Sequence, residues 1–509
     1  MNKNNRLLLA FFINIVLSTC IYGQDAGSSI KKNFIFSAIA GTNSKPDSIK
    51  LPSEVRLAKI TKGDSSSFKI HIYNKGLAVL QFSPIAGFTG IARAELQLLN
   101  TSGKIIYVAS LTGLSTPGLE GRNEPPLSGI VDALGYQISI GWKELDNHCL
   151  PELQGEELAS SLFKKAGKGK VEILPLARYS PDFEVPFGYY LNTNKGPQLY
   201  QAGVLAKRTN YPEHQILFPA IASGTGSFDP GDKQFGFYAT GPTHSGYSED
   251  SWNMLLHPSH AVHATRIYPV KDKEGRLLKH TYLICFEEAK NGDYNDYVFL
   301  VKNIVPVKDD YFTALFNGKN LEGWDIFLRN IGNTDPNNNF RIVNGELFVS
   351  GKDLGYVITK KGYKNFHLKV DFKWGEKRWP PRGEAKRDAG ICYNIPINEP
   401  DSIWPQSIEC QIQEGDVGDF WLLGFSTIKV NGIKNVPANH TRMIKQKDAE
   451  KPSGTWNTVE VISYNGKCVH IVNGVVVNVG EEASVKEGKI LLQSEYAEIY
   501  YRNIKIRGL

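Results

Sequence analysis

The sequence predicts an all-β protein made of three β-sandwich domains. Short runs that alternate polar and apolar residues recur along the chain, as strands with one buried face require. Glycine (48 residues), tyrosine (23) and phenylalanine (25) are frequent, while charged residues make up only 22%, which is typical of globular, strand-rich proteins. A chain of 509 residues is too long for one hydrophobic core, so two or three domains are expected.

The first 23 residues have the pattern of a secretory signal peptide. Lys3 and Arg6 give a positive start, and the apolar run Leu7–Leu17 is too short to anchor the chain across a bilayer. Gly23 offers a small residue for cleavage before Gln24. We therefore expect a secreted or periplasmic protein without a transmembrane segment.

A second interpretation of this leader remains open. Leu17-Ser18-Thr19-Cys20 resembles a bacterial lipobox, in which a lipid anchor at Cys20 would make the protein an outer-membrane lipoprotein. Thr19 is bulkier than that site prefers, which favours the cleaved signal peptide.

Charge and cysteines exclude two classes of function. The net charge of +6 falls to +4 once Lys3 and Arg6 are removed with the leader, and no basic cluster stands out, so we expect no nucleic-acid partner. The five cysteines after Cys20 are widely spaced and form no C-x-x-C pair, which argues against a zinc-thiolate site.

Two sandwiches are expected before the C-terminal third. Residues 24–114 contain short alternating strands and resemble immunoglobulin-like modules of bacterial surface proteins. Residues 115–308 read as a second, accessory sandwich with a short helix at Ser128–Leu134 and another at Glu156–Lys164. The charged stretch Lys308-Asp309-Asp310 is the expected linker to the third domain.

Two acidic groups in the second sandwich could serve as calcium ligands. Glu249 and Asp250 form one group, and the other is Glu287, Glu288, Asp293, Asn295 and Asp296. Carboxylate and amide oxygens bind calcium, but the spacing does not match an EF-hand. Asp, Asn and Gly also fill turns for local reasons, so solvated turns are the favoured interpretation.

The most informative stretch runs from Trp404 to Trp421. Glu409, Gln411 and Gln413 alternate with the apolar Ile408, Cys410 and Ile412, which predicts a strand with one polar face. Carboxylates for acid–base work, amides for hydroxyl groups and indole faces for the ring suit a sugar ligand. The plain alternative is an edge strand with a polar face.

From residue 312 to the end, the chain resembles the family of 3-keto-disaccharide hydrolases. The resemblance rests on several pieces in order: FNGKNLEGW, FRIVNGELFVSG, YVITKKGYKNFHLKVDFKWG, RDAGICYN, WPQSIECQIQEGDVGDFW, GTWNTVEVI, VNGVVVN and GKILLQSEYAEIYYRNIKI. It implies that residues 309–509 form a concanavalin A-like jelly roll, two curved antiparallel sheets with a concave face for sugar. Asn-Gly turns at 344, 465 and 473 suit that architecture.

The resemblance implies cleavage of glycosides that carry a ketone at C3, such as 3-keto-disaccharides or 3-keto-glucosides. A C3 ketone acidifies the C2 proton, so a general base can start an elimination that hydration completes. We assign Glu409 as the base and Glu414 or Asp416 as the acid or a metal ligand. A divalent cation, calcium or manganese, could stabilise the enediolate.

Several residues are expected to hold the sugar. Arg387 and Gln411 would bind the keto-sugar, with Gln413 beside them on the same strand. Trp379 lies in the Pro- and Gly-rich insertion Lys373–Gly390, and Trp404 and Trp421 bracket the central strand. Any one charge in that insertion could equally be a solvated surface group.

Two other functions remain open at this point. Jelly rolls often bind carbohydrate without turnover, so a non-catalytic carbohydrate-binding protein is one alternative. A conventional β-glycosidase is the other, although such an enzyme of this fold would need a Glu-x-Asp-x-Glu or Glu-x-Asp-x-x-Glu strand. Gln411 and Gln413 depart from that pattern.

Overall fold

The computed structural model describes residues 32–73, 76–146, 148–149, 151–207, 215–307 and 312–509. The signal peptide with Cys20 and the linker at 308–310 lie outside these residues. Within them the chain is almost entirely β-structure, which confirms the predicted class. None of the helices in this part of the chain has the length and hydropathy needed to span a bilayer.

The N-terminal segment, residues 32–116, consists of two sheets with apolar side chains between them. One sheet has the order β1 (Asn33–Ile39), β7 (Ile105–Thr116), β6 (Gly90–Leu99), β3 (Leu57–Thr61), and the other has the order β2 (Asp47–Lys50), β5 (Leu77–Phe82), β4 (Phe68–Tyr73). Phe34, Phe82 and Leu96 lie in the shared core. Alternate residues of these strands are buried, as the period-two pattern predicts.

The middle segment, residues 117–307, is also a sandwich. Its first sheet is β13 (Ile221–Gly224), β11 (Gly196–Leu205), β10 (Val185–Thr193), β15 (Gly236–Thr240), β16 (Ser245–Tyr247). Its second is β12 (Gln215–Leu217), β9 (Val171–Tyr179), β19 (Tyr297–Lys302), β18 (Leu277–Phe286), β17 (Thr265–Lys271), with β14 (Ser227–Phe228) beside β9; β20 (Ile304–Pro306) and β8 (Phe163–Lys165) form a separate pair. Phe187, Phe237 and Phe299 fill the space between the sheets.

The helices of the middle segment correct part of the sequence analysis. The helix expected near residue 128 is present as α1 (Leu127–Ala133), whose apolar side packs on the second sheet. The helix expected at Glu156–Lys164 is absent, and that prediction was wrong: the backbone of Leu158 bonds to Ile267, and Glu157 binds Arg266. A nine-residue helix has little stability of its own, so such tertiary contacts prevail.

The acidic groups of the middle segment are not solvated turns, which corrects the favoured interpretation. Glu249 is fully buried and leads into α2 (Asp250–Leu256), a helix that the sequence did not reveal. In the second group, Glu287, Asp293, Asn295 and Asp296 are all buried. Burying ionisable groups is expensive unless they have partners.

The C-terminal segment, residues 312–509, is a jelly roll of two large sheets. The ten-stranded sheet contains β23 (Phe340–Val343), β24 (Glu346–Val349), β38 (Ala497–Gly508), β27 (Phe366–Arg378), β34 (Asn457–Tyr464), β35 (Lys467–Val472), β36 (Val475–Glu481), β31 (Lys429–Val430) and β32 (Ile433–Lys434), with β21 (Thr313–Ala314) on β38. The eight-stranded sheet contains β22 (Trp324–Leu328), β25 (Gly355–Thr359), β37 (Glu487–Ser494), β28 (Gly390–Ile395), β29 (Ser407–Gln411), β30 (Phe420–Leu423) and β33 (His440–Met443), with β26 (Tyr363–Lys364) on β37.

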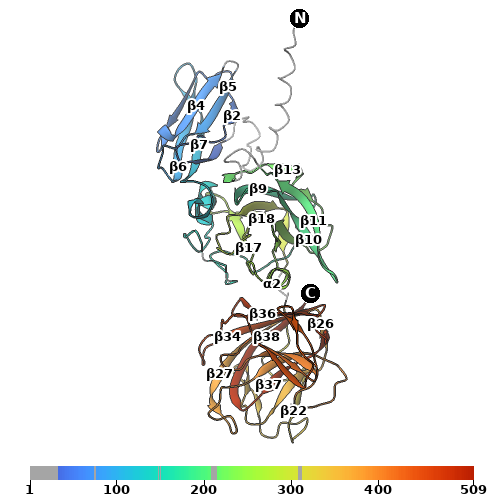
Figure 1. The fold of residues 1–509 in the computed structure, drawn as a ribbon. Coiled ribbons are helices and arrows are strands. Elements are labelled where there is room, and N and C mark those ends of the chain that lie inside the picture. Colours follow the sequence, from blue (N-terminus) through green and yellow to red (C-terminus); the bar gives the residue numbers. More distant parts are fainter. Residues whose placement is uncertain (1–31, 74–75, 147, 150, 208–214, 308–311) are drawn as a thin grey trace.

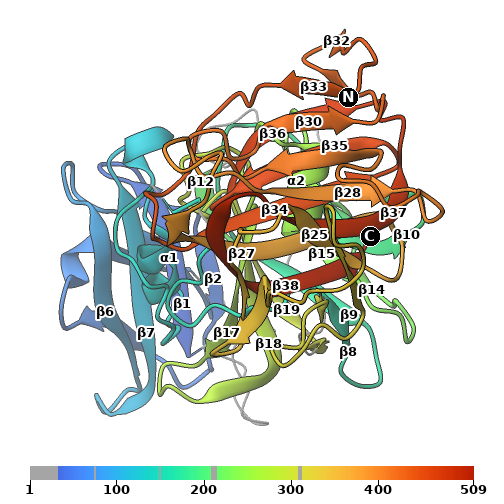
Figure 2. The ribbon, with the colours of Figure 1, turned by 90° about the horizontal axis from the view of Figure 1, so that it is seen from below.

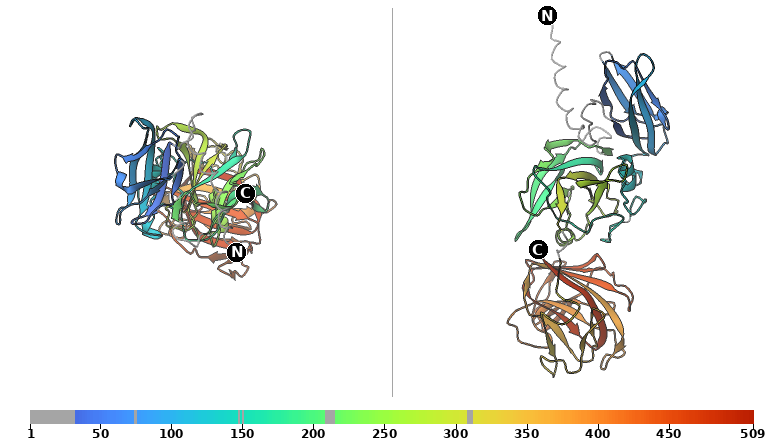
Figure 3. Two further views of the ribbon diagram at one scale, coloured as in Figure 1. Left: turned by 90° about the horizontal axis from the view of Figure 1, so that it is seen from above. Right: turned by 180° about the vertical axis from the view of Figure 1, so that it is seen from behind.

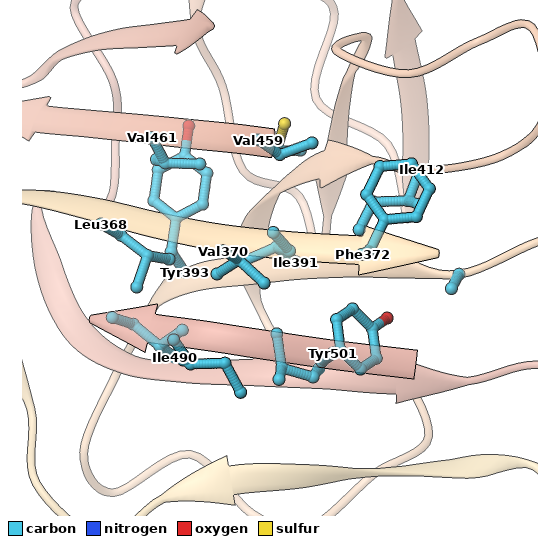
Figure 4. Packing of buried hydrophobic residues seen from close by; sticks show 14 of the residues in the cluster. Leu368, Val370, Phe372, Ile391, Tyr393, Ile412, Val459, Val461, Ile490 and Tyr501 are labelled. Carbon is cyan, nitrogen blue, oxygen red and sulfur yellow. The ribbon is translucent and has the colours of Figure 1, made fainter. Parts of the chain in front are cut away.

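Apolar side chains from both sheets form the core of the jelly roll. Figure 4 shows Leu368, Val370 and Phe372 of β27 in contact range of Ile391 and Tyr393 of β28. Because strand residues alternate in direction, their neighbours in sequence project from the outer faces of the sheets. The outer face of the eight-stranded sheet carries the polar residues discussed below.

The middle segment packs on the outer face of the ten-stranded sheet. Figures 1 and 3 show it between the N-terminal and C-terminal segments, and Figure 1 labels β34, β36 and β38 in the part of the jelly roll that faces the middle segment. Trp252 and Met254 of α2 share an apolar cluster with Ile462 and Val469. The middle segment thus covers one side of the jelly roll and leaves the eight-stranded sheet free. Figure 2 looks onto this end, where β28 and β37 run side by side.

A buried ion pair joins these two segments. Arg507 at the end of β38 donates to Glu249 through Nη2 at 2.5 Å, and both side chains are at most 7% exposed. Tyr190 and Asn192 also donate to the Glu249 carboxylate, at 2.8 and 2.9 Å. Ser251 shares a hydrogen bond of 2.8 Å with His367 of β27. These contacts set the orientation of the jelly roll relative to the middle segment.

Candidate functional site

Glu409 lies on β29, on the face opposite the jelly-roll core. Ile408 and Cys410 belong to the core cluster, so the alternation read from the sequence is confirmed. The alternative interpretation, an edge strand, is ruled out because β28 and β30 flank β29. Its polar face is not open either, since Glu409 is only 5% exposed.

A glycine on the neighbouring strand makes room for the Glu409 carboxylate. Glu409 is paired with Cys392 of β28, and Gly390 lies two residues along that strand on the same face; a Cβ there would come within 1.9 Å of Glu409 Oε1 and 2.8 Å of Gln493 Oε1. Any larger residue would therefore displace the carboxylate. Gln493 of β37 hydrogen-bonds with Glu409, while its own Oε1 has no partner among the described residues.

Two further carboxylates lie close to Glu409. Asp388 precedes β28 and Glu495 follows β37, and the two residues form an isolated β-bridge. Arg382 from the insertion binds both, at 2.5 Å to Asp388 Oδ2 and 3.1 Å to Glu495 Oε1. Tyr496 holds a left-handed backbone (φ +59°) directly after Glu495, a strained conformation that is frequent at functional sites.

The environment favours the protonated forms of these acids. Burial raises the pKa of Glu409 well above its usual range, and the charges of Glu495 and Asp388 raise it further. Burial and the charge of Asp388 raise the pKa of Glu495 to about 7. Burial also raises the pKa of Asp388, against the opposing effects of Arg382 and Gln413. Carboxyl groups with raised pKa values are suited to take up and release protons near neutral pH.

Aromatic side chains lie beside these acids on the same face of the sheet. Trp421 of β30 is directly opposite Glu409 in the strand register. Trp404, Trp421 and Phe327 are partly exposed and pack on an apolar cluster that includes Tyr356. Exposed aromatic faces next to polar groups are suited to the C–H side of a sugar ring.

Three other residues expected at the site form ion pairs away from Glu409: Arg387 pairs with Glu414, and Asp416 pairs with other basic side chains. Arg387 donates to Glu414 from its backbone N–H at 2.9 Å and from Nη1 at 2.8 Å. Burial raises the pKa of Glu414, but hydrogen bonds from Ser453 and Arg387 outweigh it and the net shift is downward. Asp416 pairs with Lys386 at 3.2 Å and with Arg442 at 2.9 Å. The lowered pKa makes Glu414 a poor proton donor near neutral pH.

Three other side chains predicted to bind the sugar make hydrogen bonds within the protein itself: Gln411, Gln413 and Trp379. Gln411 turns back on its own chain, where its Oε1 accepts from the N–H groups of Ile412 and Gln413 at 2.8 and 3.1 Å. Gln413 donates to Asp388 at 2.7 Å and so supports the acid cluster. Trp379 donates to the Ser350 carbonyl at 2.9 Å, and the ammonium groups of Lys352 and Lys377 lie over its ring.

Sequence reasoning missed Gln493 and Glu495, and it considered Arg382 and Asp388 only among the charges of the insertion. The sequence did contain a sign of these residues, because polar side chains stand in or beside apolar strands. Gln493 and Glu495 interrupt or end the run ILLQSEY, and Asp388 stands directly before the strand AGICYN. Their convergence depends on strand pairing between segments about 100 residues apart.

A hollow elsewhere in the jelly roll does not offer the same chemistry. It encloses about 500 Å³ between Lys364, Asn365, Asn465, Ser484, Lys486 and Glu487. Its carboxylate, Glu487, is paired with Lys364 at 2.8 Å. We therefore place the candidate site at Glu409.

A known protein family matches the chain over nearly the whole jelly roll. Residues 311–507 match the family model of the 3-keto-alpha-glucoside-1,2-lyase-like domain. The jelly roll is similar to this domain, and we call it the lyase-like domain below. The match supports a carbohydrate-active, glycosidase-like function for the C-terminal segment. No curated protein matches the chain.

Solved structures similar to the lyase-like domain include several carbohydrate-related proteins. A "putative glycosyl hydrolase" from Parabacteroides distasonis is 21% identical and covers 40% of this chain and 98% of its own, with a TM-score of 0.29. A carbohydrate-binding module from Bacillus subtilis (10% identity, 36% and 96% coverage, TM-score 0.27) and a β-glucanase from Bacillus licheniformis (13%, 40% and 100%, 0.26) also match.

Proposed function

We propose that the lyase-like domain cleaves glycosides whose sugar carries a ketone at C3, by elimination followed by hydration. The observation that carries the proposal is the buried Glu409, whose pKa is raised by burial and by two neighbouring acids. The family match supports the same substrate class. A carboxylate with a raised pKa is a stronger base than an ordinary one, which suits removal of a carbon-bound proton.

In this proposal Glu409 removes the proton from C2, and the electrons of that C–H bond move into an enolate on the C3 oxygen. The enolate then forms the C1–C2 double bond while the bond from C1 to the aglycone oxygen breaks. We assign Glu495, whose pKa burial raises to about 7, as the acid that protonates that oxygen. Water next adds across the double bond, with hydroxyl on C1 and hydrogen on C2, so the net reaction is hydrolysis.

In this proposal Arg382 binds the keto-sugar, which is the role that the sequence analysis assigned to Arg387. Its guanidinium lies between Asp388 and Glu495, where a positive charge can stabilise an oxygen that becomes negative during the reaction. The described residues near Glu409 do not bring three carboxylate oxygens within 4.8 Å of one another. The proposal therefore gives a divalent cation no step at this site.

Incubation of the full chain with matched substrates tests the proposal. We expect a 3-keto-glucoside to be cleaved and the corresponding unoxidised glucoside to remain intact, with or without a chelator. Product formation is followed by chromatography. Cleavage of the unoxidised glucoside would identify a conventional β-glycosidase, and retention on carbohydrate without product would identify a binding protein.

The pH profile should depend on Asp388. Glu409 acts as a base only when it is ionised, so kcat/KM is expected to rise with pH through its raised pKa. Asp388→Asn removes a negative charge that raises this pKa, and the rising part of the profile should move to lower pH. The control is Asp325→Asn, an aspartate on the same sheet that is half exposed and paired with Lys360. An unchanged profile in Asp388→Asn would contradict a role for this charge at Glu409.

A further inference from the structure

The middle segment contains a group of buried acids that is independent of the lyase-like domain. Glu287, Asp293 and Asp296 lie in the loop that joins β18 to β19, and each offers a carboxylate oxygen within 4.8 Å of the other two. All three side chains are buried. Because calcium–oxygen distances are about 2.4 Å, two ligands on one calcium ion lie at most about 4.8 Å apart, so oxygens this close can share one ion.

No salt bridge offsets these three charges among the described residues. Burial lowers the pKa of Arg178, and the nearby charges of Glu288 and Asp296 only partly oppose this shift. Its guanidinium, however, donates to the Ser180 hydroxyl and to the carbonyls of Ala206, Pro181 and Phe183. Three ionised carboxylates buried together are strongly unfavourable without a cation.

A buried amide beside the acids supplies a second, separate observation. Asn295 is fully buried and donates through Nδ2 to the Pro125 carbonyl at 3.0 Å, while its Oδ1 has no hydrogen-bond partner among the described residues. The side chain hydrogen-bonds with Glu124, and the backbone N–H of Asn295 donates to Asp293 Oδ1 at 3.4 Å, so the residue lies beside the acids. An unpartnered buried amide oxygen at this position is a ready fourth ligand.

The loop backbone turns the acids toward one another. Gly292 and Tyr294 both have left-handed backbones, with φ of +76° and +55°. A side chain at 292 would come within 2.5 Å of the His148 backbone nitrogen, so the loop also packs tightly against that neighbour. Glu287 is held by the N–H groups of Ala289 and Asp293, at 2.8 and 2.9 Å. Backbone N–H groups therefore hold both carboxylate oxygens of Glu287 in place.

We propose that Glu287, Asp293, Asp296 and Asn295 bind one calcium ion that fixes the loop between β18 and β19. An all-oxygen set suits calcium, which accepts irregular geometry and six to eight ligands. Magnesium fits less well because it demands a near-octahedral shell at about 2.0–2.1 Å and retains several waters. The ion would stabilise the central strands of the second sheet and has no part in the chemistry at Glu409.

Metal analysis and thermal unfolding of the full chain test this site. Protein purified in calcium should contain one calcium per chain by mass spectrometry. Removal with EGTA should lower the unfolding midpoint of the middle segment by roughly 5–10 °C, as expected for a ligand at about 100 times its Kd. Added calcium should restore it, whereas equal magnesium or manganese should not.

Matched variants separate the site from general effects of charge. Asp296→Asn keeps the shape but removes one ligand charge, and should weaken calcium binding by roughly 10- to 100-fold or more. Asp232→Asn, at an exposed loop position, should bind calcium as the unchanged protein does. If Asp296→Asn does not fold, the calcium titration of the unchanged protein decides whether the site binds calcium. No calcium in the purified chain and no midpoint shift on titration would overturn the proposal, as would an equal response to magnesium.

Discussion

Replacing Glu409 with glutamine is expected to lower turnover of a 3-keto-glucoside by roughly a hundred- to ten-thousand-fold. This corresponds to about 3–5 kcal/mol of activation free energy. Glutamine keeps the size of the side chain and its hydrogen bond with Gln493 but cannot take the C2 proton. Because the substitution also removes a buried acid, the unfolding midpoint should stay the same or rise.

Isotope exchange distinguishes a base from a residue that only supports the fold. In deuterated solvent, the unchanged protein should exchange the C2 proton of the keto-sugar, and Glu409→Gln should not. Glu481→Gln is the control, since that side chain is 58% exposed at the end of β36. A folded Glu409→Gln protein with near-normal turnover would remove Glu409 from the mechanism and leave Glu495 as the next candidate.

Replacing Arg507 with methionine should produce the largest loss of stability. The substitution leaves the buried Glu249 carboxylate without the cation to which it is bound. Breaking a buried ion pair on one side costs about 3–5 kcal/mol, which corresponds to a fall in unfolding midpoint of roughly 5–15 °C. Calorimetry of the full chain measures this fall, and a separate transition for the jelly roll would show that its contact with the middle segment has been lost.

A double substitution and a surface control complete this test. Glu249→Gln combined with Arg507→Met removes both charges and should recover much of the lost stability, because an isolated buried charge is what makes the single variant costly. Arg276→Met breaks an exposed pair with Asp272 and should change the midpoint little, since such pairs contribute about 0–1 kcal/mol. If Arg507→Met and Arg276→Met behave alike, the buried pair does not secure the two segments.

The sequence by itself determined the all-β class and the identity of the central strand. Alternation over Ile408–Gln413 is a local property, and it correctly placed Ile408 and Cys410 in the core and Glu409 on the opposite face. The matched pieces after residue 312 were specific enough to predict the jelly roll, because many short motifs in a fixed order rarely coincide by chance. The signal peptide, the lipid anchor and the division into three independently folding domains stay predictions.

The tertiary structure decided which charged groups meet. Asp388 and Glu495 are 107 positions apart in the chain, and only the pairing of β28 with β37 brings them to Glu409. The same holds for Arg387, which the structure pairs with Glu414, and for Glu249, which it buries against Arg507. Sequence patterns report which face a residue occupies, because that depends on local periodicity. Desolvation and the distance between charges set pKa values and ion pairs, and both depend on contacts between residues far apart in the chain.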